Sequence, residues 1–412
     1  FGRQVTVARE GRECESTMSA WGAAKRGVAD VIEAIEQSKL ECVVILSNRT
    51  FGAAEAVRLA AALKSPASRV AELRCSGHDV GETGARALGE AVGLSQTLTA
   101  VDLGHSSMGD AQIASFIEGA CKSTKLLSLE LDLKDIGDAG ASALANGLKA
   151  NSSVETVVLS RNVFGSAEAL AGLLDANKTI KYLDVSENAE VQSGLDQLLR
   201  GGALVELRCS GNAKSAFDAR LAQPFLAAAT RLQSLDVSGM GLDDADAVQL
   251  ARGLGACYTF SELRISRCNL TAVAAEALAA AAQPSEAKRP WQLLDVSANA
   301  GIGAAGAALL MACDVATLLL NAVGCGDAGA ALIAATLATS TTKTLGLSAN
   351  GLTDVGAQCL ASALVDSNLL TLEVGDNLQI SAAGVQLFKN AEAMRPGLDV
   401  ALLERPQQPP QS

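Results

Sequence analysis

The sequence predicts an α/β solenoid, in which short repeats of one strand and one helix stack along the chain. Three observations predict this fold. The hexapeptide ELRCSG stands at 72–77 and again at 206–211, and a near copy, ELRIS, begins at Glu262. One pattern of apolar residues recurs in register with these copies every ~24 to 31 residues, most often about 28. The chain is 49% hydrophobic but only 3% aromatic, which is typical of helices that pack closely through small side chains.

Each repeat begins with a predicted strand that has apolar residues at positions one, four and six. Because alternate residues of a strand face opposite sides, positions four and six point into the solenoid and positions three, five and seven point out. Position nine turns the chain inward, and an Asn there can hydrogen-bond the unpaired backbone of its own turn and the neighbouring turn. This Asn occurs at Asn48, Asn162, Asn188, Asn212, Asn299, Asn350 and Asn377, whereas His78, Lys134, Met240, Cys268 and Val323 replace it.

The second half of each repeat predicts a helix, as at 52–65, 138–151 and 354–368. Apolar residues recur there at spacings of three and four, which gives a stripe that can pack on the strand layer. Asp138, Asp327 and Asp354 stand where an N-cap residue would stabilise a helix.

Three segments are expected along the chain. Residues 1–39 form an N-terminal segment with a capping helix, because stacked repeats expose their apolar core at each end. Residues 40–398 form the solenoid of about thirteen repeats. Residues 399–412 are rich in Pro and Gln and are expected to form an extended tail, with a docking peptide as the alternative. The apolar side of the capping helix consists of Trp21, Val28, Val31, Ile32 and Ile35.

These repeats resemble leucine-rich repeats, and specifically those of the ribonuclease-inhibitor-like subclass. The resemblance covers roughly nine tenths of the chain. It implies a horseshoe with a parallel sheet on the concave face and helices on the convex face. The repeat type is similar to that of NOD-like receptor sensor domains and Ran GTPase-activating proteins. The subclass implies protein binding, but it does not name a partner.

The charge of the chain restricts its partners. A net charge of −12 argues against nucleic acid and anionic membrane surfaces, because phosphate binding requires clustered Lys and Arg. Proteins, basic ones included, remain as partners. The least charged region, 298–342, is divided by Asp314 and Asp327 into pieces too short for a membrane span of ~20 residues.

The cysteines indicate a reducing compartment. The ten cysteines are scattered without a CxxC pair, which favours neither a disulfide framework nor a zinc site. We therefore expect an intracellular protein, cytoplasmic or organellar. A cleaved targeting segment upstream of Phe1 stays open, because the chain does not begin with Met.

The outward position five gives the partner-binding candidates. Charge alternates along this column from Asp184 to Asp295, so either a partner contacts a polar patch here or the residues form a self-satisfied ladder of ion pairs. Apolar residues near the two ends of the column suggest a second contact, with coverage by the chain's own cap or tail as the alternative. The candidates are Asp102, Glu130, Asp184, Arg208, Asp236, Arg264, Asp295, Val44 and Leu319.

The sequence predicts no catalytic, cofactor or metal site. His78 and His105 fall at a similar level of successive repeats, but no third ligand has a matching spacing. Cys75 and Cys209 occupy the inward position six and are expected to be inert, buried thiols. No P-loop, nucleophile elbow or HExxH motif occurs.

The expected function is therefore that of a non-enzymatic scaffold or a subunit of a hetero-complex, which binds proteins through its concave face, rim or flank. The alternative is a regulator of another enzyme, either an inhibitor or a GTPase activator. The segments SRNVFG at 160–165 and SNRTFG at 47–52 place Arg161 and Arg49 at rim positions, which resembles the rim Arg and Asn of Ran GTPase-activating proteins. The acidic tail of that family is missing here, so its role is not carried onto Arg161 and Asn162. A third hypothesis, an innate-immune sensor module, would require a nucleotide-binding domain upstream of Phe1.

Overall fold

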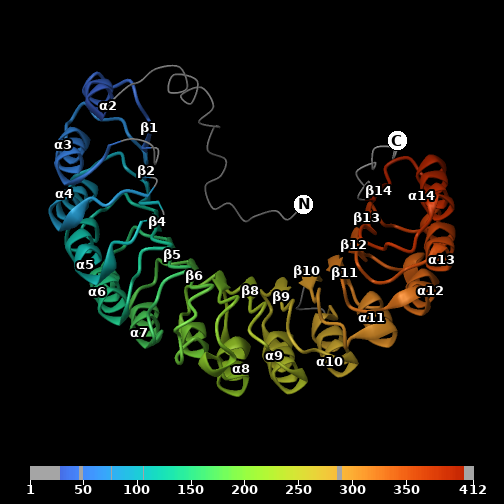
Figure 1. Ribbon diagram of the computed structural model, residues 1–412. Coiled ribbons are helices and arrows are strands. Elements are labelled where there is room, and N and C mark those ends of the chain that lie inside the picture. The colour runs from blue at the N-terminus through green and yellow to red at the C-terminus, as the bar shows by residue number, and fades with distance from the viewer. Residues whose placement is uncertain (1–27, 46–49, 76, 105, 285–289, 403–412) are drawn as a thin grey trace, which may run out of the picture. The chain divides into compact units, whose positions relative to one another are not determined.

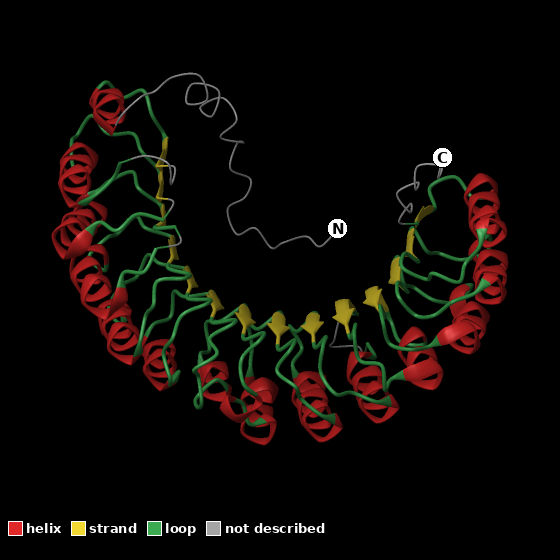
Figure 2. Cartoon of the chain, viewed as in Figure 1, coloured by secondary structure: helices red, strands yellow, loops and turns green. Residues whose placement is uncertain are grey.

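The computed structural model describes residues 28–45, 50–75, 77–104, 106–284 and 290–402. The chain forms two compact units, Phe1–Asp184 and Val185–Ser412. Within each unit the strands form one layer and the helices form the other (Figure 1; Figure 2). This alternation of strand and helix confirms the predicted α/β solenoid.

In the first unit, strands β1 to β6 form a parallel sheet in the order in which they occur in the chain. Each helix from α3 to α7 connects two neighbouring strands, as parallel pairing requires. The elements are α2 (Val28–Glu36), β1 (Cys42–Ile45), α3 (Ala53–Leu63), β2 (Glu72–Cys75), α4 (Gly81–Leu94), β3 (Ala100–Asp102), α5 (Gly109–Ala120), β4 (Ser128–Glu130), α6 (Asp138–Leu148), β5 (Thr156–Val158), α7 (Glu168–Ala176) and β6 (Tyr182–Asp184).

The second unit continues the pattern with strands β7 to β14, again parallel and in chain order. Its first repeat has a 3₁₀ helix in place of an α-helix. The elements are η1 (Asp196–Arg200), β7 (Glu206–Arg208), η2 (Lys214–Ala216), α8 (Ala219–Ala228), β8 (Ser234–Asp236), α9 (Asp244–Ala256), β9 (Glu262–Arg264), α10 (Ala272–Ala282), β10 (Trp291–Asp295), α11 (Gly303–Met311), β11 (Val315–Leu319), α12 (Gly326–Leu337), β12 (Thr344–Gly346), α13 (Asp354–Leu364), β13 (Thr371–Glu373), α14 (Ala382–Met394) and β14 (Asp399–Ala401).

The predicted strand register is confirmed by burial. Leu73 and Leu207 at position four are fully buried, and so are Cys75 and Cys209 at position six. Burial raises the pKa of the Cys75 thiol to about 12, so this cysteine is an inert part of the core. Ile265 is buried in the same slot, which shows that the slot needs an apolar side chain rather than a thiol.

The predicted Asn ladder is present wherever its members are described. The Oδ1 atom of Asn162 accepts hydrogen bonds from the backbone N–H groups of Lys134 and Ile136 in the preceding repeat, at 2.9 and 3.1 Å. Its Nδ2 atom donates to the carbonyls of Leu131 and Leu159. One amide thus satisfies buried backbone groups of two turns. Equivalent bonds join Asn212, Asn299, Asn350 and Asn377 to their preceding repeats, and Asn48 lies outside the described residues.

The predicted N-cap role of three aspartates is wrong in detail. Asp138 and Asp354 are the first residues of α6 and α13, and Asp327 is the second residue of α12. From inside the helix, each carboxylate reaches the N-terminus of the helix in the next repeat. Asp327, for example, accepts from the N–H and the hydroxyl of Thr353 at 2.9 and 2.6 Å. These aspartates therefore link successive helices.

The described residues begin and end inside the two expected terminal segments. The capping helix is described from Val28, with Val31 and Ile35 buried as expected, and Trp21 lies outside the described residues. At the other end, β14 pairs with β13 and extends the sheet beyond residue 398. Residues 403–412 of the expected tail lie outside the described residues.

Candidate interaction surface

The nine candidate residues all lie on strands, on the face that points away from the core, and all are half-buried. Val44, Asp102, Glu130 and Asp184 belong to the first unit, and the other five belong to the second. In the second unit, the strand register sets Arg208, Asp236, Arg264, Asp295 and Leu319 side by side on β7 to β11. Together with Glu206 and Glu262 of the same face, the charged members of this row are named the polar strip.

Each arginine of the polar strip pairs with a glutamate of its own strand. Arg208 lies 2.8 Å from the Glu206 carboxylate, and Arg264 lies 3.5 Å from that of Glu262. Residues two apart on a strand project from the same face, which explains both contacts. The ELR sequence therefore forms its ion pair locally.

The aspartates of the polar strip are held by the backbone instead. Asp236 accepts a hydrogen bond from the N–H of Ser238 through Oδ1, and Asp295 accepts one from Ser297, both at 2.9 Å. Neither aspartate has an ion pair within 4.0 Å among the residues that the structure describes. The ladder of cross-strand ion pairs that was the alternative interpretation is therefore not formed at these two positions.

Part of the polar strip is buried. The side chain of Glu206 is only 5% exposed, and burial raises the pKa of its carboxyl against the opposing effect of Arg208. Ser234 stands between Glu206 and Glu262 in the register of the sheet. Its buried hydroxyl has no hydrogen-bond partner among the described residues.

The first unit combines two acidic side chains on neighbouring strands with a buried lysine. Asp102 and Glu130 face each other across β3 and β4. Lys134, which replaces the ladder Asn, is wholly buried and donates from Nζ to the carbonyl of Asp132 at 3.2 Å. Burial lowers the pKa of this ammonium, and the carboxylates of Asp132 and Asp102 oppose that shift. The sequence showed that Lys134 occupies a position where other repeats have Asn, but the burial of its side chain was not predicted.

The expected apolar contact near the C-terminal strands is smaller than the sequence suggested. Leu319 is half-buried, but Leu293 on the neighbouring strand is buried. At Gly346, an added Cβ would lie 2.8 Å from Oδ1 of Asn321, so the Asn321 side chain fills the space left by this glycine. Asn321 also accepts a hydrogen bond from the N–H of Ser348. On β11 and β12 this face therefore carries Thr317, Thr344 and the Asn321 amide in addition to Leu319.

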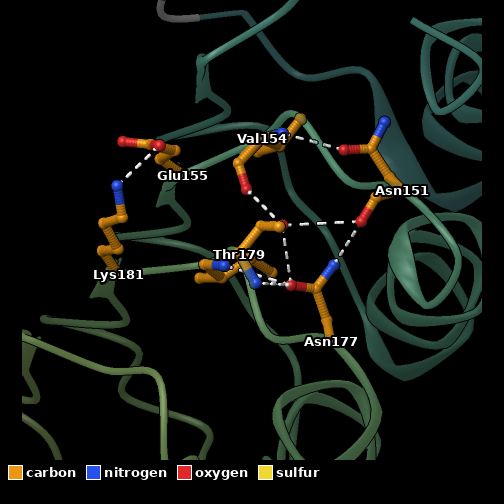
Figure 3. Close-up of polar contacts among 7 residues, drawn as sticks. Asn151, Val154, Glu155, Asn177, Thr179 and Lys181 are labelled. Atoms are coloured by element: carbon orange, nitrogen blue, oxygen red, sulfur yellow. Dashed lines mark hydrogen bonds and ion pairs between the residues drawn. The ribbon is translucent and has the colours of Figure 1, made fainter. Parts of the chain in front are cut away.

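A second polar ladder, which the sequence reasoning missed, runs along the rim where the strands of the first unit begin (Figure 3). The Nδ2 atom of Asn177 donates to the carbonyls of Leu148 and Asn151, both at 2.8 Å, and its Oδ1 atom accepts from the N–H of Thr179. Asn151 makes the equivalent bonds one repeat earlier. The signal was an Asn three residues before position one.

Beside this ladder, a pair of charged side chains joins neighbouring strands. Nζ of Lys181 lies 2.6 Å from the carboxylate of Glu155 (Figure 3). Both side chains are partly exposed, so the pair contributes at most about 1 kcal/mol to stability.

The residues considered for chemistry have structural surroundings. The His78 ring is buried and makes an edge contact with Phe51, with centroids 5.4 Å apart, whereas His105 lies outside the described residues. Asn162 uses its amide for the ladder, so it is not available at a rim as the resemblance to GTPase activators would require. Within the described ranges, no group of three or more His, Cys, Asp or Glu could hold a metal ion.

None of the helices in the described part of the chain is both long and apolar enough to cross a membrane.

Comparison with known proteins identifies the repeat. A family model described as "Leucine Rich repeat" matches residues 122–145, which include β4 and the start of α6. The Tonsoku-like protein of Mus musculus is 27% identical over 211 residues, which are 47% of this chain and 16% of that protein. The human capping protein, Arp2/3 and myosin-I linker protein 3 is 31% identical over 172 residues, which are 38% of this chain and 12% of that protein. The chain therefore spans a small part of the length of these relatives.

Among solved structures, the crystal structure of the Rad7 and Elc1 complex in yeast is similar, with a TM-score of 0.50 and 16% sequence identity. The similarity covers 95% of this chain and 90% of the other. At this identity the likeness bears on the fold alone.

Proposed function

We propose that this chain, whose repeats form a leucine-rich-repeat solenoid, is a non-enzymatic scaffold or a subunit of a hetero-complex that binds another protein through the polar strip. The proposal includes the ribonuclease-inhibitor-like subclass, which the strand-and-helix repeat with an Asn ladder supports. It also includes an intracellular location, for which the spacing of the cysteines is the argument.

One observation carries the proposal. Asp236 and Asp295 are half-buried, each is fixed by a backbone N–H through one oxygen, and neither forms an ion pair within 4.0 Å among the described residues. A carboxylate held in this way is already ordered, so a partner's Lys or Arg can bind it at a small cost in side-chain entropy. Arg264 between them adds a donor for an acidic or carbonyl group of the same partner.

The partner is therefore a protein with a basic segment. The net charge of −12 favours the encounter with such a partner at long range, and the alternation of Asp and Arg along the strip would set its register. An inhibitor of a basic enzyme would use the same carboxylates.

The test removes the two free carboxylates without changing side-chain size. Proteins captured by the full chain from its native source are compared with those captured by the double variant Asp236→Asn, Asp295→Asn. The control variant, Glu276→Gln with Asp366→Asn, loses the same charge at exposed positions on α10 and just after α13.

We expect the strip variant to bind a captured protein at least about tenfold more weakly, with a smaller salt dependence, while the control variant binds normally. An equal loss of affinity in both variants would show that the effect comes from net charge and not from the position of the carboxylates. Undiminished binding by the strip variant would reject the polar strip as the contact surface.

A further inference from the structure

Three links between successive helices in the second unit, α9–α10, α12–α13 and α13–α14, have a common design. Asp244, Asp327 and Asp354 each lie in the first turn of a helix, and each accepts two hydrogen bonds from the residue that caps the next helix. One bond comes from a backbone N–H at 2.8 or 2.9 Å, and the other comes from a hydroxyl at 2.6 Å. The hydroxyl donors are Thr271, Thr353 and Ser381.

The link at Asp196 lacks the hydroxyl. Asp196 is the first residue of η1, and the residue that caps the next helix, α8, is Asp218. A carboxylate cannot donate as a Thr or Ser hydroxyl does. Asp196 is 5% exposed, and its Oδ2 atom is buried without a hydrogen-bond partner among the described residues. The atom left unsatisfied is the one that the hydroxyl satisfies at the other three links.

The pKa shifts have opposite directions at the two kinds of link. The Ser381 hydroxyl lowers the pKa of Asp354, and Asp327 has a lowered pKa despite its burial because Thr353 donates to it. Burial raises the pKa of Asp196, and the charge of Asp218 acts in the same direction. Backbone N–H groups of Asp196 and Asp218 oppose this effect without reversing it.

One cation near Asp218, the Lys214 ammonium, is engaged by other acids. Lys214 and Arg220 line the same surface hollow as Asp218. The Lys214 ammonium lies 2.6 Å from Asp243 and 2.7 Å from Asp246, which also line this hollow. Arg220 contacts Asp218 through its backbone N–H, which donates to Oδ1 at 2.8 Å. Asp196 and Asp218 are thus two acids at the positions where the other three links pair an acid with a hydroxyl.

We propose that Asp196 and Asp218 form a proton-dependent link between η1 and α8. When Asp196 is protonated, its O–H supplies the donor that the other links obtain from Thr or Ser, and it donates to the Asp218 carboxylate. When the proton leaves to water, two carboxylates face each other and the link loosens.

The direction of the pH dependence follows from the same contacts. A carboxyl whose pKa is higher in the folded state than in the unfolded chain binds its proton more tightly when folded. The stabilisation is complete below the unfolded pKa of about 3.9, and it is lost as the pH rises through the folded-state pKa of Asp196.

Hydrogen exchange of the full chain, followed by mass spectrometry from pH 4 to 7 and corrected for intrinsic rates, tests the proposal. We expect the protection of η1 and of the first turn of α8 to fall roughly three- to tenfold across this range, while β9 keeps its protection. Protection of η1 and α8 that is constant with pH would overturn the proposal.

Two substitutions make the test specific. Asp218→Thr restores the hydroxyl, so it should abolish the pH dependence and raise protection at pH 7. Thr353→Asp creates the acid pair at the link between α12 and α13, which should then acquire the same pH dependence. Because Asp218→Thr is expected to stabilise the fold, retention of the pH dependence in a folded Asp218→Thr protein would contradict the assignment.

Discussion

The same hexapeptide, ELRCSG, occurs in both units, and its two copies share their inner face but not their outer face. Leu73 and Cys75 on β2 are buried, as are Leu207 and Cys209 on β7. On the outer face, the side chain of Glu72 is 33% exposed and that of Arg74 is 48% exposed, whereas the values for Glu206 and Arg208 are 5% and 30%. Identical local sequence thus gives one ion pair in solvent and one that is largely removed from it.

The difference comes from the neighbouring strands. β2 lies between β1 and β3, which present Cys42, Val44, Ala100 and Asp102 on the same face. β7 is followed by β8 and β9, and Arg264 of β9 acts on the pKa of Glu206 together with Arg208. The copy in the second unit is therefore part of a larger group of charges.

The largest expected effect tests the shared inner face. Leu73→Ala and Leu207→Ala should each lower the free energy of unfolding of the unit concerned by about 2–5 kcal/mol, because both side chains are fully buried and leave a cavity. Denaturant unfolding measures this change, with hydrogen exchange to assign it to a unit. A loss below about 1 kcal/mol at only one site would break the equivalence of the inner faces.

An intermediate effect concerns the turn slot that Lys134 fills in the first unit. Lys134→Asn should stabilise this unit by about 1–2 kcal/mol at neutral pH, because an amide can bond the turn and carries no buried charge. Since the folded-state pKa of Lys134 is lowered, the folded wild type binds its proton less tightly than the unfolded chain. Its stability should rise as the pH rises toward the unfolded pKa of about 10.4.

Thermal unfolding at pH 7 and pH 9 compares the wild type with Lys134→Asn. The advantage of the variant should shrink at the higher pH. An advantage that is the same at both values would separate the effect from the charge of Lys134.

The smallest expected effect distinguishes the two glutamates. Glu206→Gln should change stability at pH 7 by less than about 1 kcal/mol, because the lost ion pair and the relieved burial of charge oppose each other. The raised pKa of Glu206 stabilises the fold below the unfolded pKa of about 4.3, and this contribution is lost as the pH rises through the folded-state pKa.

The Glu206→Gln variant should therefore lose part of the stability that the wild type gains in acid. Denaturant unfolding at pH 4 and pH 7 measures it, with Glu72→Gln as the matched control. An equal change in the Glu72→Gln protein would show that the outer faces of the two copies are equivalent after all.

The sequence predicted the strand register, the buried thiols and the Asn ladder, because each depends on spacing within one repeat or on a bond to the adjacent one. Asn162 and Asn299 act as expected for this reason. The prediction from sequence failed where the partner of a side chain depends on the neighbouring repeat. Asp354 serves the cap of α14 rather than its own helix, and Asp236 remains without the Arg partner that its neighbours in the column suggested.

By itself, then, the amino-acid order determined a stack of strand-and-helix repeats, because periodic apolar side chains can be buried in only one register. The tertiary structure alone decided which charged side chains stay exposed to water, which are buried, and which carboxyl oxygen is buried without a hydrogen-bond partner among the described residues. Those outcomes depend on side chains from neighbouring turns, and the solvation of a charge is set by everything within a few ångströms of it.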